Sequence, residues 1–177
     1  VAEDPAVALR LAQEEVEALT RSYENLKTEL PKLRQLHERA RGLATVRFYT
    51  NLKGVRTILE DVLTTVATQK TKQYRAYSST RIAPILREAY PNFTKDRIAQ
   101  GIAVKVFGLG GTGQVRGLDE RKQLTQNTPS PAYIIIYGEK VAMISLDDHQ
   151  RPRGVLIEDD AITETYRLIF DTEWSAR

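Results

Sequence analysis

The sequence predicts an α/β domain with a mixed sheet of about six strands flanked by helices, preceded by a long N-terminal helix. Over residues 1–42, apolar residues recur every three or four positions, which is the period of an amphipathic helix. From Thr45 onward, short β-branched and aromatic runs alternate with helical patterns. Two apolar runs then flank Gly138 as in a hairpin, and a last helical pattern follows. We therefore expect a helix over 1–42 and an α/β domain over 43–177.

The long helix is predicted to begin at Asp4 and Pro5, since an aspartate cap followed by proline is a common helix start. Its apolar stripe follows the heptad spacing of a coiled coil, which predicts a homodimer interface. The stripe comprises Leu9, Val16, Leu19, Tyr23, Leu26, Leu30 and Leu33. The alternative is that the stripe packs on the chain's own domain. Pro31 lacks a backbone donor, which predicts a kink or a new helix there.

The remaining elements follow from local patterns and turn residues. Strands are predicted at 45–50, 73–78, 102–107, 132–137, 140–145 and 154–158. Helices are predicted at 55–63 after a turn at 51–54, at 81–89, at 92–100, and at 160–174 with Asp160 as the cap. Segment 108–117 is expected to be a loop and segment 119–125 a short helix. Strands separated by helices, then a hairpin and a closing helix, predict a mixed sheet.

Composition excludes several classes of protein. Hydrophobic residues make up 41% of the chain and charged residues 28%, which is ordinary for a globular protein. The absence of cysteine excludes disulfide scaffolds and thiol chemistry. No apolar run is long enough for a membrane span and no signal peptide is apparent, so we expect a cytoplasmic protein. A net charge of only +3 does not predict a nucleic-acid surface.

One glycine-rich stretch resembles a nucleotide-binding motif. Residues 108–113, Gly-Leu-Gly-Gly-Thr-Gly, satisfy G-x-G-x-x-G directly after a predicted strand. The context differs from a dinucleotide site, because residues 114–118 are a poor helix start and the strand is the third of the domain. A loop is therefore the preferred interpretation, and anion binding by its backbone amides is the alternative.

No catalytic or metal-binding pattern is present. His37 and His149 lie in different predicted elements, and the acidic pairs and triplets near 147 and 158 suit a solvated turn and a helix start. The sequence contains no P-loop, H-E-x-x-H or G-x-S-x-G motif. We therefore predict a protein without catalytic residues, cofactor or metal.

A small ligand would be expected at the carboxyl ends of the first strands, where open α/β sheets form their binding crevice. Lys53 and Arg81 could meet an anionic group there. The candidate ligand-binding residues are Asn51, Lys53, Gly54, Ser78, Ser79, Arg81, Gly108, Gly110 and Gly111.

Several stretches together carry a family resemblance. They are Ala-Glu-Asp-Pro at 2–5, Glu-Leu-Pro-Lys-Leu at 29–33, Val-Arg-Phe-Tyr before Lys-Gly-Val over 46–55, the run 136–145, and 162–174. In order and spacing they resemble the TrmB-like transcriptional regulators over nearly the whole chain. The resemblance implies a dimerisation helix followed by a phospholipase-D-like domain without its catalytic residues, which agrees with the missing H-x-K motif.

The resemblance also implies partners. DNA would be bound only through a winged helix-turn-helix domain upstream, in keeping with the missing initiator Met, and a small-molecule effector would bind the α/β domain. Sugar-sensing members carry a further β-rich region after this domain, and here Arg177 follows directly after the closing helix. We therefore expect an effector-sensing and dimerising domain of a transcription regulator. The alternatives are a nucleotide- or phosphate-binding enzyme that uses the glycine loop, and a protein-interaction adaptor.

Overall fold

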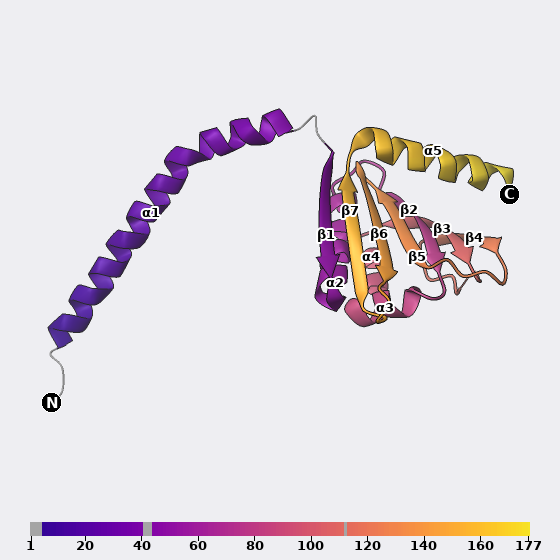
Figure 1. Ribbon diagram of the computed structural model, residues 1–177, viewed down its shortest axis with the longest axis horizontal. Coiled ribbons are helices and arrows are strands. Elements are labelled where there is room, and N and C mark those ends of the chain that lie inside the picture. The colour runs from indigo at the N-terminus through magenta and orange to yellow at the C-terminus, as the bar shows by residue number, and fades with distance from the viewer. Residues whose placement is uncertain (1–4, 41–43, 112) are drawn as a thin grey trace. The chain divides into compact units, whose positions relative to one another are not determined.

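A computed structural model provides the structure, which describes residues 5–40, 44–111 and 113–177 (Figure 1). Within the helix at the start of the chain, side chains are described for residues 6, 7 and 9–31. The chain divides into two compact units, Val1–Leu43 and Ala44–Arg177, which we describe separately. None of the described helices is both long and apolar enough to cross a membrane.

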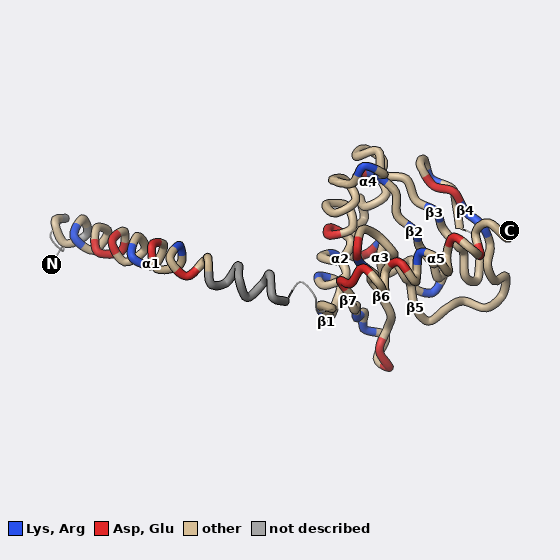
Figure 2. Tube along the Cα trace, turned by 90° about the horizontal axis from the view of Figure 1, so that it is seen from above, with Lys and Arg blue, Asp and Glu red and all other residues tan. Residues whose placement is uncertain are grey.

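The first unit is a single helix, α1, spanning Pro5–Ala40. Pro31 lies inside this helix, so no second helix begins there. The described apolar residues of the predicted stripe, from Leu9 to Leu30, are all exposed, and the side chain of Leu33 lies outside the described set. Charges of both signs alternate along the helix, with ion pairs one turn apart such as Arg21 with Glu17 (Figure 2). α1 thus presents an apolar stripe bordered by mixed charge.

The second unit is an α/β domain built on one seven-stranded sheet, so the predicted fold class is confirmed. Its elements are β1 (Thr45–Thr50), α2 (Asn51–Ala67), β2 (Gln73–Ser79), α3 (Ala83–Ala89), α4 (Phe93–Ala99), β3 (Ala103–Leu109), β4 (Asp119–Thr125), β5 (Ala132–Tyr137), β6 (Lys140–Leu146), β7 (Pro152–Glu158) and α5 (Asp160–Ala176). The strand order is β1-β7-β6-β5-β2-β3-β4. β2, β3 and β4 run parallel, and the other neighbours are antiparallel.

The seventh strand, β4, corrects the sequence prediction of a short helix over 119–125. It pairs in parallel with β3, with Val104 opposite Asp119 and Phe107 opposite Lys122. As an edge strand of sequence Asp-Glu-Arg-Lys-Gln-Leu-Thr, it has no apolar alternation from which its period could be recognised. Its place in the sheet depends on pairing with β3, and the local sequence pattern gives no indication of that pairing.

Two helix starts also differ from the prediction. α2 begins at Asn51, directly after β1, where the sequence suggested a turn over 51–54. Asn51 has a positive φ of 62°, and its side-chain oxygen accepts hydrogen bonds from the backbone N–H groups of Lys53 (2.9 Å) and Gly54 (3.2 Å). In α5 the cap is Asp159 rather than Asp160, since the Asp159 carboxylate accepts from the N–H of Ile162 at 2.7 Å. Both residues satisfy the free donors of a first helical turn.

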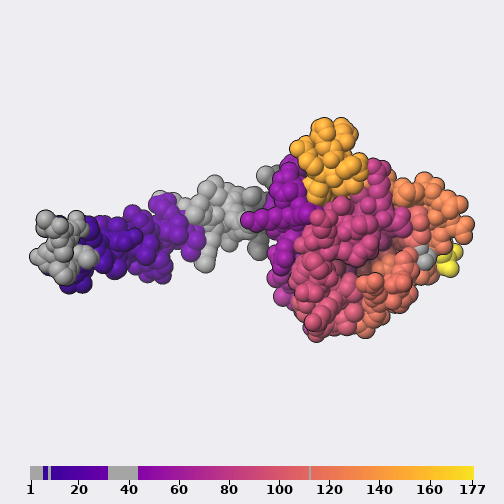
Figure 3. All heavy atoms as spheres, turned by 90° about the horizontal axis from the view of Figure 1, so that it is seen from below, coloured from indigo at the N-terminus to yellow at the C-terminus, as the bar shows by residue number. Residues whose placement is uncertain are grey.

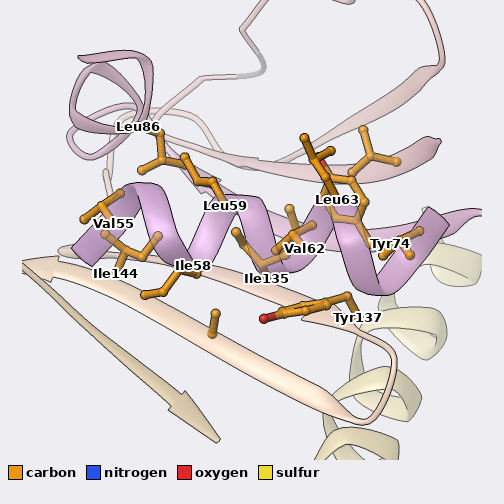
Figure 4. Packing of buried hydrophobic residues seen from close by; sticks show 14 of the residues in the cluster. Val55, Ile58, Leu59, Val62, Leu63, Tyr74, Leu86, Ile135, Tyr137 and Ile144 are labelled. Atoms are coloured by element: carbon orange, nitrogen blue, oxygen red, sulfur yellow. The ribbon is translucent and has the colours of Figure 1, made fainter. Parts of the chain in front are cut away.

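The two faces of the sheet bury different cores. On one face, α2 inserts Val55, Ile58, Leu59 and Val62 among buried residues of the central strands (Figure 4). On the other face, α5 contributes Phe170 and Trp174, which pack on Phe107 of β3 with ring centroids 4.8 and 5.1 Å from it. Arg75 of β2 binds the Asp171 carboxylate with both ends of its guanidinium group (2.7 and 2.6 Å). α2 and α5 therefore cover opposite faces.

Candidate ligand-binding groove

A groove of about 750 Å³ lies between α3 and α4 and the parallel strands β2, β3 and β4. α2 packs on β7, β1 and α3, so it leaves the far half of this sheet face to α3 and α4. The connection from β3 to β4 forms no helix in its described residues, 110, 111 and 113–118. Parallel strands are usually joined by a helix that fills this space. Because a loop takes its place here, a groove remains over the sheet beside α4. Figure 3 shows the side of the domain on which α3 and α4 lie.

Aromatic side chains supply much of the groove lining. Tyr74 from β2 and Tyr133 from β5 lie on the sheet, while Tyr90 and Phe93 lie at the adjoining ends of α3 and α4. The rings of Tyr90 and Phe93 meet edge to face, with centroids 5.9 Å apart. Leu86 adds an aliphatic surface. The groove therefore offers an apolar, partly planar surface to a ligand.

The groove also contains four guanidinium groups and one carboxylate, from Arg87, Arg97, Arg116, Arg121 and Asp119. Arg97 of α4 is only 2% exposed, and it donates to the backbone carbonyls of Ile102 (2.7 Å), Leu118 (2.9 Å) and Arg116 (2.9 Å). Two of these carbonyls belong to the β3–β4 connection. Arg97 thus ties this connection to α4.

Asp119, at the start of β4, is 8% exposed and is already paired. Its carboxylate accepts from the backbone N–H of Arg116 at 2.6 Å and from Nε of Arg121 at 2.8 Å. Because β-strand side chains alternate, Asp119 and Arg121 point to the groove, whereas Lys122 points to Trp174 on the opposite face. This carboxylate is therefore engaged within the protein.

Burial affects the ionisation of two groove tyrosines. Burial is the main cause that raises the pKa of the Tyr74 hydroxyl well above its usual range, and it likewise raises the pKa of Tyr133. Near neutral pH both hydroxyls are uncharged, as tyrosine hydroxyls ordinarily are, and both can donate and accept hydrogen bonds.

The structure brings only some of the predicted ligand residues together. Ser78 and Gly111 line the groove. Ser79 is fully buried and donates to the carbonyl of Ser130, while its hydroxyl oxygen accepts from the N–H of Arg81 at 3.2 Å. The side chain of Arg81 is exposed outside the groove lining. Ser79 is therefore committed to holding two loops.

Asn51, Lys53 and Gly54 follow β1, at one edge of the sheet, with β7, β6 and β5 between it and β2. The structure therefore does not place segment 51–54 beside the ends of β2 and β3. Gly54 lies against Tyr49, since a Cβ added at this glycine would be 3.0 Å from the Tyr49 Cβ. The contribution of these three residues to ligand binding stays a prediction.

The glycine-rich stretch differs from a dinucleotide-binding turn. Gly108 is a buried residue of β3 rather than part of the predicted loop. Gly110, Gly111 and Gly113 have positive φ angles of 82°, 142° and 69°, and no helix follows among the described residues of this connection. A pyrophosphate in a dinucleotide site is bound at a helix N-terminus, which this segment does not provide. In the described part of the chain, no group of three or more His, Cys, Asp and Glu side chains could hold a metal ion.

The sequence analysis did not identify most of the groove. Tyr74, Tyr133, Arg97 and Arg121 come from four separate elements, and no spacing in the sequence links them. Had segment 119–125 been recognised as a strand, Arg121 could have been identified. Side chains alternate along a strand, so Asp119 and Arg121 would have been placed on the same face.

Comparisons with known proteins add two likenesses of fold. No protein-family model and no curated protein sequence matches the chain. A solved structure of TrmBL2, described as an archaeal chromatin protein with a novel mode of DNA binding, matches 98% of this chain and 70% of its own, with 13% identity and a TM-score of 0.44. NucT from Helicobacter pylori matches 73% of this chain and 94% of its own, with 11% identity and a TM-score of 0.46. The name of the first of these proteins, TrmBL2, is that of the TrmB-like family, which the sequence resembles.

Proposed function

We propose that the α/β domain binds a small-molecule effector in the groove and that α1 joins two copies of the chain, as the sensing and dimerising part of a transcription regulator. The observation that carries the proposal is the groove itself, which combines aromatic walls with several polar groups directed to one space. Its volume, about 750 Å³, is within the range usual for small-molecule sites. The proposal includes no catalytic step.

The regulatory part of the proposal rests on the sequence resemblance and on α1. A helix of 36 residues with an exposed apolar stripe is suited to pairing with a second helix. An effector bound between α3, α4 and the β3–β4 connection would favour the arrangement of these segments to which it binds more tightly. Contact with DNA would be made by a domain outside these residues, as in the regulators that the sequence resembles.

The groove is tested by blocking it. Ser78 lies at the end of β2 and lines the groove, so Ser78→Trp should fill part of its volume. A library of metabolites is screened by thermal shift against the parent protein, against Ser78→Trp, and against Thr172→Trp on the exposed side of α5. We expect compounds that stabilise the parent and Thr172→Trp but not Ser78→Trp. Compounds that stabilise all three equally, or none that stabilise the parent, would contradict the proposal.

A further inference from the structure

The geometry points to an organic anion with an aromatic or apolar body as the class of molecule that the groove binds. This inference rests on the proposed function, because it concerns the ligand of the same groove. It combines three features of the lining: an excess of positive charge, two exposed guanidinium groups at the opening, and aromatic walls.

The positive charge of the protein is concentrated at the groove. The whole chain has a net charge of only +3, whereas the groove lining alone contains Arg87, Arg97, Arg116 and Arg121 against the single carboxylate of Asp119. A cleft with charges of one sign and low-dielectric walls concentrates the electrostatic potential inside it. The groove therefore attracts anions more strongly than the net charge of the protein suggests.

Internal partners compensate only part of this charge. The hydrogen-bond acceptors of the buried Arg97 are three neutral backbone carbonyls, which satisfy its N–H groups without cancelling its charge. Asp119 compensates one positive charge by its ion pair with Arg121. The surplus positive charge is therefore a property of the folded domain.

Two arginines at the opening are available to a ligand. The guanidinium groups of Arg87 and Arg116 belong to exposed residues, and Arg116 has a long contact, 3.4 Å, to the neutral side-chain oxygen of Gln114. The structure shows no carboxylate bound to either side chain within the described part of the chain. Guanidinium groups bind carboxylate, phosphate and sulfonate oxygens through paired N–H donors. A cationic ligand would instead be repelled by these guanidinium groups, and the Asp119 carboxylate in the lining is already bound to Arg121.

The aromatic and apolar walls of the groove indicate the chemistry of the part of the ligand that does not contact the arginines. Tyr74, Tyr90, Phe93 and Tyr133 provide ring surfaces, and Val104 and Val106 form an apolar floor on β3. Tyrosine hydroxyls are uncharged near neutral pH, so these walls do not repel an anion. A planar or apolar body between these walls would gain apolar contact while its anionic group reaches the arginines.

The test compares two fluorescent probes that differ by one anionic group. These are 1-anilinonaphthalene-8-sulfonate and the neutral N-phenyl-1-naphthylamine, each titrated into the full chain, with the signal of Ser78→Trp subtracted as binding outside the groove. The variant Arg87→Gln/Arg116→Gln removes the two exposed charges. Lys95→Gln, an exposed residue of α4 outside the groove lining, is the matched control for loss of positive charge.

We expect the sulfonate probe to lose about tenfold or more in affinity for the double variant, while the neutral probe and the Lys95→Gln control stay close to the parent. Equal binding of both probes, unaffected by the double variant but abolished in Ser78→Trp, would overturn the anion inference and leave the effector groove standing. Probe binding that Ser78→Trp does not reduce, or no binding at all, would count against both proposals. Circular dichroism spectra of all variants verify that each is folded.

Discussion

At the scale of single residues, close packing around the groove depends on glycines in the left-handed region. Gly110 follows β3 with a φ of 82°, and an added Cβ would be 2.8 Å from the Thr80 hydroxyl and 3.0 Å from the backbone of Pro129. Gly101 has a similar φ of 69° but nothing within 4 Å of such a Cβ. The two positions separate the cost of backbone strain from the cost of crowding.

The first prediction uses this pair. Gly101→Ala should lower the free energy of unfolding by about 1 kcal/mol, since only the left-handed backbone is strained. Gly110→Ala should lower it by about 3 kcal/mol, because the methyl group also displaces Thr80 and Pro129. Urea denaturation measures both values. Equal losses for the two variants would show that the crowding at Gly110 relaxes without cost.

The second prediction concerns the buried hydroxyl of Tyr74. Its pKa is raised in the folded state, so its contribution to stability is fully present below the unfolded-state value of about 10 and is lost as the pH rises toward the folded-state value. Above about pH 10, the parent should lose stability more steeply than Tyr74→Phe, by about 1.4 kcal/mol per pH unit. Urea titrations between pH 9 and 11.5 measure the difference. Parallel pH profiles would contradict the burial of this hydroxyl.

At the scale of elements, the domain depends on how the β3–β4 connection is held without a helix. Arg97 takes the place of that helix, since one buried side chain of α4 binds the carbonyls of Arg116 and Leu118. Gly117 lies directly against the same helix, where an added Cβ would be 2.6 Å from a methyl group of Ile98. The groove therefore owes its shape to contacts between α4 and a loop.

The third prediction removes this support. Arg97→Met keeps an apolar chain of similar length but removes a charged donor from three carbonyls, of which that of Leu118 still accepts from the N–H of Val104. The loss should cost about 3 kcal/mol of unfolding free energy. Lys95→Met on the exposed side of the same helix should change it by less than about 0.5 kcal/mol. Urea denaturation compares them. If the two variants were equally stable, Arg97 would not be what holds the connection.

At the scale of the whole molecule, the chain has two units with different requirements. The unit Ala44–Arg177 buries its own core on both faces of the sheet. α1 exposes apolar residues that include Leu19, at 72%, and Leu26, at 63%. A helix with so much exposed apolar surface is stabilised in water mainly by packing against a partner.

The fourth prediction follows from that requirement. The chain should be a dimer by light scattering, and both Ala44–Arg177 alone and the variant Leu19→Glu/Leu26→Glu should be monomers, because paired carboxylates in the seam are unfavourable. Ala18→Glu/Asn25→Glu adds the same charges away from the stripe and should remain a dimer. Monomers throughout would show that α1 is not a dimer interface.

Features with a local period could be predicted from the sequence. The spacing of apolar residues indicated α1 and its stripe, and β-branched and aromatic runs indicated β1, β2, β3, β5, β6 and β7, because burial on one face repeats at the period of the element. Pro84 lies in the first turn of α3, where its missing N–H is not needed.

The other features depend on contacts between distant parts of the chain. Pairing with β3 made the polar segment 119–125 a strand, and the antiparallel order of β7, β6 and β5 separated β1 from β2. The groove consists of residues from β2, α3, α4, β3, β4 and β5, whose meeting depends on contacts between residues far apart in the chain. Such long-range pairings leave no periodic pattern along the sequence. The edge strand β4 and the groove could therefore be identified only from the three-dimensional structure.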